Sequence, residues 1–92
     1  MKLSWDEAKR QATLEERGLD FASAEELFKE LNYTTEDARK DYGEQRYISV
    51  GSISRRLCVV VWTPRGSKRH IISMRKANDR EQKRFKVSLG QG

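Results

Sequence analysis

The sequence predicts a single α+β domain over residues 1–92, with two N-terminal helices, an antiparallel meander of three or four strands and a C-terminal helix. The hydrophobic pattern has a helical period up to about residue 32 and the pattern of strands from there to about residue 74. Short turn signals separate the apolar runs of the second half, so consecutive strands should pair as antiparallel neighbours. No internal repeat or linker divides the chain.

The first helix is predicted to begin at a capping box, in which Ser4 and Glu7 satisfy each other's backbone amides, and to end at Gly18. Asp20 is expected to cap a second helix, and Asn32 to stop it. The apolar residues of this second helix recur at helical spacing and should pack on the sheet: Phe21, Ala24, Leu27, Phe28 and Leu31.

Strand patterns occur at residues 33–35, 45–50, 57–63 and 68–74. The run 57–63 is apolar on both faces, as expected for a central strand. Turns are expected near residues 51–54 and at 64–67, where proline and glycine favour the required dihedral angles. Asn78, followed three residues later by Glu81, is predicted to open a final helix that runs to about Val87 and packs on the same side of the sheet as the others.

Composition excludes several classes of protein. The longest apolar run, Cys58 to Trp62, is far shorter than the roughly 20 residues of a membrane helix, and the first residues lack the apolar stretch of a secretion signal. The one cysteine, Cys58, forms no internal disulfide and builds no cysteine-rich zinc site. We therefore expect a cytoplasmic protein without a membrane association.

Charge is divided unevenly along the chain. Residues 1–46 carry a net charge of −4, whereas residues 47–92 carry +9 with only two acidic side chains, Asp79 and Glu81. A basic surface raises the local concentration of polyanions, chiefly nucleic acids. This asymmetry favours a nucleic-acid partner over a basic face that only keeps the protein in solution.

The sequence holds no recognisable motif for a metal, a nucleotide or a nucleophile, and no cofactor is expected. The basic half has too few carboxylates for a two-metal nuclease. Cleavage of RNA without metal requires groups that move protons and cations that stabilise the phosphate in the transition state. His70 is a candidate acid or base but equally a structural histidine, and Glu44 is a candidate base or a loop carboxylate paired with Arg46. If Ile72 faces the core, alternation places Arg69 and Arg75 together on the open face of the sheet.

Motifs along nearly the whole chain resemble those of the BrnT toxins. They occur in the family's order: Trp5-Asp6-Glu7-Ala8-Lys9, Gly18-Leu19, Glu25-Glu26-Leu27-Phe28, Gly43-Glu44-Gln45-Arg46, Thr63-Pro64-Arg65, Ile71-Ile72-Ser73-Met74-Arg75 and Arg80-Glu81. The resemblance implies a small bacterial ribonuclease toxin with a RelE-like fold. It also implies a BrnA-like antitoxin that neutralises the toxin and carries the DNA-binding part through which the pair represses its own promoter.

The resemblance assigns Arg46, Arg65 and Arg75 to basic positions of the family, and Lys9 and Glu44 to polar ones. The chain also departs from the family at several positions. Glu16-Arg17 stand where a Lys-His pair is usual, Lys40 and His70 stand in place of a histidine and an arginine, and Phe85 replaces a tyrosine. Lysine and arginine still bind phosphate, so we expect RNA binding to persist where a histidine is lost.

Two functions follow. The first is the toxin of a type II toxin–antitoxin pair, a metal-independent endoribonuclease that inhibits translation; Arg65 and Arg75 hold the scissile phosphate, Arg46 stabilises the transition state, and His70 or Glu44 transfers a proton. Further basic residues bind RNA: Lys9, Lys68, Arg69, Arg80 and Arg84. The expected partners are the antitoxin, RNA and, through the antitoxin, operator DNA. The alternative is a non-catalytic basic module that binds nucleic acid or an antitoxin, and only cleavage products separate the two functions.

Overall fold

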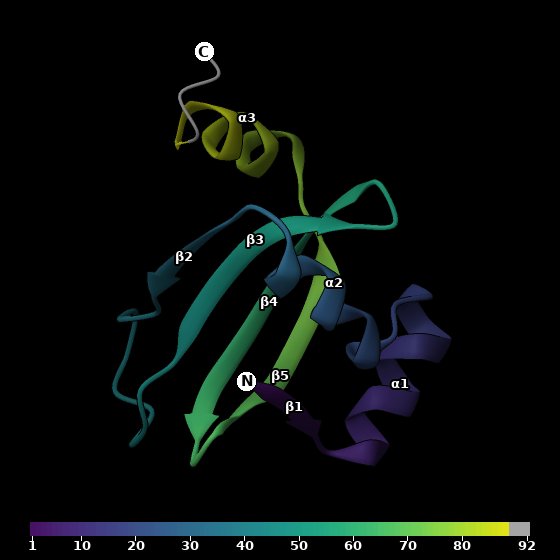
Figure 1. The fold of residues 1–92 in the computed structure, drawn as a ribbon, viewed down its shortest axis with the longest axis vertical. Helices are drawn as coiled ribbons and strands as arrows, with labels where there is room; N and C mark the ends of the chain where they lie inside the picture. The colour runs from purple at the N-terminus through teal and green to yellow at the C-terminus, as the bar shows by residue number, and fades with distance from the viewer. Residues whose placement is uncertain (89–92) are drawn as a thin grey trace.

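The computed structural model describes residues 1–88 and confirms the α+β class (Figure 1). Five strands form one mixed sheet in the order β1-β5-β4-β3-β2, in which β1 runs parallel to β5 and the other neighbours are antiparallel. In chain order the elements are β1 (Lys2–Trp5), α1 (Glu7–Arg17), the 3₁₀ turn η1 (Phe21–Ser23), α2 (Ala24–Lys29), β2 (Asn32–Glu36), β3 (Tyr47–Ile53), β4 (Arg56–Arg65), β5 (Lys68–Lys76) and α3 (Asp79–Ser88).

The N-terminal strand β1 is absent from the sequence prediction, and its presence moves the start of the first helix. Ser4 lies in β1, so the predicted capping box is wrong. Asp6 caps α1 instead, its carboxylate accepting hydrogen bonds from the backbone amides of Ala8 (2.9 Å) and Lys9 (3.3 Å). Gly18 ends the helix in the left-handed conformation (φ 68°), as predicted.

The second helix is shorter than its apolar pattern suggests. Asp20 caps the 3₁₀ turn that precedes α2, and α2 ends at Lys29. Leu31 lies beyond the helix and is 65% exposed, so its predicted place in the core is wrong, and Asn32 begins β2. The remaining apolar residues do pack on the sheet, with Leu27 fully buried.

The core lies between the sheet and the layer formed by α1, η1 and α2. Its fully buried apolar residues are Phe21, Ala24, Leu27, Val60, Ile71 and Met74. We call this side of the sheet the helix side and the opposite side the open face. The third helix is on the open face: Glu81 and Phe85 of α3 line a pocket with Ile48 and Val50. The prediction that all helices pack on one side is therefore wrong. No helix within residues 1–88 is long and apolar enough to span a membrane.

A β-bulge in β5 determines which basic residues share a face. The pairing shifts between Val61, which pairs with Ser73, and Trp62, which pairs with Ile71. The extra residue, Ile72, reverses the alternation, so that Ile71 and Met74 both point into the core.

Gly51 is a packing position within β3. The sequence interpretation places a turn near it, but β3 continues to Ile53 and the turn falls at Ser54 and Arg55, both with positive φ (51° and 67°). A Cβ atom on Gly51 would lie 2.9 Å from Cγ of Leu27 and 3.1 Å from Cβ of Asn32. The glycine therefore allows α2 to approach the sheet closely.

Gly51→Ala is expected to lower the free energy of unfolding by about 1–3 kcal/mol, because the new methyl group overlaps Leu27 in a packed core. Urea denaturation followed by circular dichroism measures this change. The control is Ser67→Ala, at the exposed β4–β5 turn, which should change the free energy of unfolding by less than about 0.5 kcal/mol. Gly66→Ala is unsuitable because Gly66 has φ +60°, a conformation that strains an alanine. Equal effects of Gly51→Ala and Ser67→Ala would contradict the packing role of Gly51.

Candidate functional site

Three of the predicted site residues meet at one end of the open face. Arg46 immediately precedes β3, Arg65 ends β4, and His70 lies near the start of β5, paired with Thr63. The Thr63 hydroxyl donates a hydrogen bond of 2.6 Å to the carbonyl oxygen of Gln45, which fixes the backbone beside Arg46. Alternation along the three strands directs the side chains of Arg46, Arg65 and His70 to the same face.

Glu44 joins the two arginines of this group. Its Oε2 atom lies 3.3 Å from Nε of Arg46, and its Oε1 atom lies 3.6 Å from Nη2 of Arg65. The Arg46 guanidinium also stacks on the ring of Tyr42, 4.0 Å from its centroid. Two guanidinium groups held side by side present donors that match phosphate oxygens, and the carboxylate occupies that position in the free protein. We call Glu44, Arg46, Arg65 and His70 the cationic cluster.

The imidazole of His70 is held by a residue that the sequence analysis missed. The Ser4 hydroxyl lies 2.9 Å from Nδ1 of His70, because β1 pairs in parallel with β5 and places the two residues opposite each other. Burial lowers the pKa of His70 below its usual 6.5, and the charge of Arg65 lowers it further. A pKa below 6.5 leaves the imidazole mostly uncharged at pH 7, and its Nε2 atom has no hydrogen-bond partner among residues 1–88.

The loop that carries the cluster is anchored by a buried carboxylate. The Asp37 side chain, 1% exposed, accepts two hydrogen bonds from the Arg39 guanidinium (2.7 and 2.8 Å) and one from the Tyr42 hydroxyl (3.3 Å). The backbone amide of Asp37 donates to the carbonyl oxygen of Arg46 at 2.8 Å. Arg39 is the main cause of the low pKa of Asp37, about 2. These bonds fix both ends of the loop that positions Glu44.

Arg75 lies on the open face but away from the cluster. It pairs with Val59, six residues before Arg65 on β4, a separation of about 20 Å along the strand. Its guanidinium makes two hydrogen bonds of 2.7 and 2.6 Å to Glu81 of α3. The structure therefore does not bring Arg65 and Arg75 to one phosphate as predicted. Arg75 instead fixes α3 to the sheet, and Glu81 also completes the predicted helix start by accepting from the Asn78 amide (2.9 Å).

Arg69 is on the helix side, so its predicted place on the open face is wrong. Arg69 shares the side of Ile71 by ordinary alternation, and Ile71 points into the core. The bulge at Ile72 separates both from Arg75, which is on the open face. Its guanidinium lies 4.2 Å from the ring centroid of Phe28 and 5.0 Å from that of Trp62. Within residues 1–88 its buried Nε atom has no hydrogen-bond partner. Arg69 is therefore a packing residue of the aromatic cluster on that side.

The remaining predicted RNA-binding residues form two groups. Lys68 is exposed and pairs with Arg65, and Lys9 is among the charges that lower the pKa of His70, so both lie near the cluster. Arg80 and Arg84 are exposed on α3.

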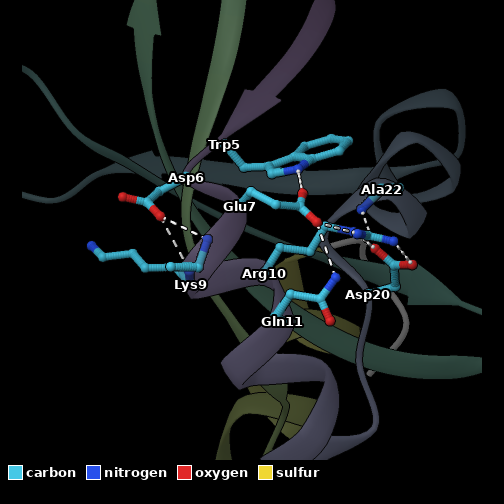
Figure 2. A network of polar contacts seen from close by, with 9 residues as sticks. Trp5, Asp6, Glu7, Lys9, Arg10, Gln11, Asp20 and Ala22 are labelled. Carbon is cyan, nitrogen blue, oxygen red and sulfur yellow. Dashed lines mark hydrogen bonds and ion pairs between the residues drawn. The ribbon is translucent and has the colours of Figure 1, made fainter.

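A polar network fixes the start of α1 beside β1 (Figure 2). Arg10 makes two hydrogen bonds to Asp20 (2.8 and 3.0 Å) and one to Glu7 (2.8 Å), and the Trp5 indole donates to Glu7 at 3.0 Å. Figure 2 shows the Lys9 side chain on the opposite side of the helix from Arg10, alongside Asp6. The network therefore positions β1 and α1 without engaging the Lys9 ammonium.

Acid is expected to destabilise the protein between about pH 4.5 and pH 2. Arg75 is the main cause that lowers the pKa of Glu81 from 4.5 to about 2. The ionised Glu81 therefore stabilises the folded protein fully above the unfolded-state pKa of 4.5, and this stabilisation is lost as pH falls through the folded-state pKa of about 2. Glu81→Gln keeps a capping oxygen but removes the ion pair, which is partly exposed and contributes about 1 kcal/mol. The free energy of unfolding, measured with urea from pH 2 to 7, should fall less steeply with acid in this variant than in the wild type. Equal pH dependence in the two proteins would contradict the role of the Arg75–Glu81 pair.

Comparison with known proteins identifies the family. A sequence model described as "Ribonuclease toxin, BrnT, of type II toxin-antitoxin system" matches residues 5–81. The match includes the whole cationic cluster and extends from the end of β1 into α3. A comparison with curated proteins finds no match. Because the match covers most of the chain, the resemblance seen in the sequence is confirmed, and the protein belongs to the BrnT family of ribonuclease toxins of type II toxin–antitoxin systems.

Proposed function

We propose that this toxin is a metal-independent endoribonuclease that inhibits translation by cutting RNA at the cationic cluster. The observation that carries the proposal is the placement of two arginines, Arg46 and Arg65, on either oxygen of Glu44 and on the same face as a neutral histidine. Paired guanidinium groups stabilise the charge that develops on a phosphate during cleavage. The neutral imidazole supplies the base that this chemistry needs.

In the proposed reaction, a phosphate of the RNA displaces the Glu44 carboxylate from Arg46 and Arg65. The ribose 2′-oxygen attacks the phosphorus, its proton passes to Nε2 of His70, and the bond to the 5′-oxygen breaks. The leaving 5′-oxygen takes a proton from water, and the hydroxide formed takes the proton held at Nε2 of His70. The products are a 2′,3′-cyclic phosphate and a 5′-hydroxyl, and the imidazole is again neutral. Throughout these reaction steps Nδ1 of His70 carries a proton, which it donates in a hydrogen bond to the Ser4 hydroxyl.

The proposed partners follow from the family. A toxin of a type II system has an antitoxin partner, and we propose that this partner is BrnA-like. It covers the open face, blocks the cationic cluster and binds operator DNA on behalf of the pair.

A non-catalytic binding module is the second candidate. It is favoured by one observation: His70 is the only histidine of the chain, so the cluster has a base but no second imidazole to protonate the leaving oxygen. Such a module would bind RNA with a steep dependence on salt, as the nuclease would. Only the products distinguish the two candidates.

The deciding experiment incubates purified protein with a mixed RNA pool in EDTA and analyses the ends of the fragments. The proposal predicts fragments with 5′-hydroxyl and cyclic-phosphate ends, and loss of these fragments with His70→Gln. RNA that is retarded in a gel but remains intact would establish the binding module instead. Fragments formed only with an added divalent cation would contradict metal independence.

His70 provides a direct test of the electrostatics of the cluster, since a chain with one histidine gives one titrating imidazole in a proton NMR spectrum. Its pKa is expected below 6.5 because of burial and Arg65. Arg65→Gln should raise this pKa, whereas Glu44→Gln should lower it, because the Glu44 charge opposes the shift. A pKa change of the opposite sign in either variant, or a wild-type His70 pKa at its usual 6.5, would contradict the placement of His70 beside Arg65 and Glu44.

A further inference from the structure

A second feature of the open face is a pocket of about 240 Å³ between the sheet and α3. Its floor consists of two cross-strand pairs, Tyr33 with Val50 and Thr35 with Ile48. Its wall consists of three side chains of α3: Glu81, Arg84 and Phe85. Family membership assigns no ligand to this pocket.

The lining of the pocket suits a flat aromatic ring. Ile48 and Val50 form an apolar floor, and Tyr33, which is 43% exposed, and Phe85 each present an aromatic ring. The volume is below the roughly 300–1,000 Å³ of pockets that hold drug-sized ligands, so it suits one small heterocycle. Aromatic side chains bind unpaired bases of single-stranded nucleic acid by stacking, largely independently of base identity.

The two charged groups of the pocket differ in their availability. Both carboxylate oxygens of Glu81 are engaged by Arg75, which compensates the negative charge that would repel RNA. Arg84 makes no hydrogen bond or ion pair with any residue between 1 and 88 that the structure describes. Its guanidinium therefore remains to contact a base or an adjacent phosphate.

The pocket lies on the same face of the sheet as the cationic cluster. Ile48 of β3 follows Arg46 by two residues, so their side chains point to the same face, about 7 Å apart along the chain. We propose that the pocket binds an unpaired base of the RNA substrate, next to the phosphate that Arg46 holds. This inference rests on the proposed function, and it names single-stranded RNA as the substrate because a base within a duplex does not enter such a pocket.

The test is a binding cycle between protein and RNA. The probes are a hexanucleotide protected from cleavage by 2′-O-methyl groups and six versions of it, each lacking one base. Phe85→Ala should weaken binding of the intact hexanucleotide by about 5- to 150-fold, the loss expected for one base–aromatic stack. It should have little further effect on the version that lacks the bound base, because the two changes remove the same contact. Val87→Ala, on an exposed residue of the same helix, is the matched control and should bind like the wild type.

Tyr33→Ala, on β2, is the second variant and should show the same non-additive loss at the same base position, even if Phe85→Ala disturbs α3. Arg46→Gln tests the cationic cluster separately and should weaken binding in any case. If it does, the pocket assignment is overturned when Phe85→Ala and Tyr33→Ala weaken binding of all seven oligonucleotides equally, or do not weaken it at all. If Arg46→Gln leaves binding unchanged as well, the proposed function fails with it.

Discussion

Arg46→Gln is expected to lower the single-turnover rate of RNA cleavage by about 10²–10³-fold, the usual effect of removing one group that stabilises charge in a transition state. Arg46 is the more enclosed of the two cluster arginines, with a side chain 26% exposed, stacked on Tyr42 and paired with Glu44. Arg65, 55% exposed and 3.6 Å from Glu44, should give a smaller loss on the same substitution.

Two variants control for the loss of positive charge as such. Arg56→Gln removes an exposed charge at the opposite end of β4, and Arg69→Met removes one on the helix side. Both should cleave RNA within a few-fold of the wild type at constant salt. Cleavage reduced equally in Arg46→Gln and Arg56→Gln would show that only net charge matters, and would contradict a site at the cluster.

Trp62→Ala is expected to have the largest effect on stability, lowering the free energy of unfolding by about 3–5 kcal/mol. Trp62 is 7% exposed, stacks on Tyr47 with centroids 4.9 Å apart and meets Phe28 edge-on at 5.7 Å. Its indole also donates a hydrogen bond of 2.8 Å to the buried hydroxyl of Ser49, which the substitution leaves without that donor.

In a domain of this size each kcal/mol lost lowers the melting temperature by about 4–8 °C, so a loss of about 3 kcal/mol or more should lower it by about 12 °C or more. The total stability of a small domain is only about 5–15 kcal/mol. Differential scanning calorimetry measures the change in melting temperature. Leu31→Ala, at a 65% exposed apolar side chain, should change the melting temperature little. Similar melting temperatures for the two variants would contradict the central place of Trp62 in the core.

Much of the fold was predictable because most elements carry a local signal. The apolar run 57–63 indicates the central strand β4, Gly18 indicates the end of α1, and Asn78 with Glu81 indicates the start of α3. The four-residue strand β1 was not predictable, because it is too short to show a period and is stabilised by pairing with β5. Its position depends on tertiary contacts that local propensity does not describe.

The geometry of the candidate site was only partly predictable. Arg46 and His70 were predicted on strands and Arg65 in the turn 64–67. In the structure Arg65 ends β4, and the three residues share one face with Glu44. Ser4 was missed because its partner His70 lies 66 residues away. Arg69 was misplaced because a single bulge residue reverses alternation, and nothing in the sequence of β5 marks that residue.

The most direct test of the proposed site is an NMR titration of the protein, labelled with ¹⁵N, with an RNA oligonucleotide whose 2′-O-methyl groups block cleavage. The shifted amides should map to the open face, including residues 44–48, residues 63–70 and Ser4, with the His70 ring signals shifted as well. Shifts confined to α1 and α2, on the helix side of the sheet, would contradict the assignment of the cationic cluster as the RNA site.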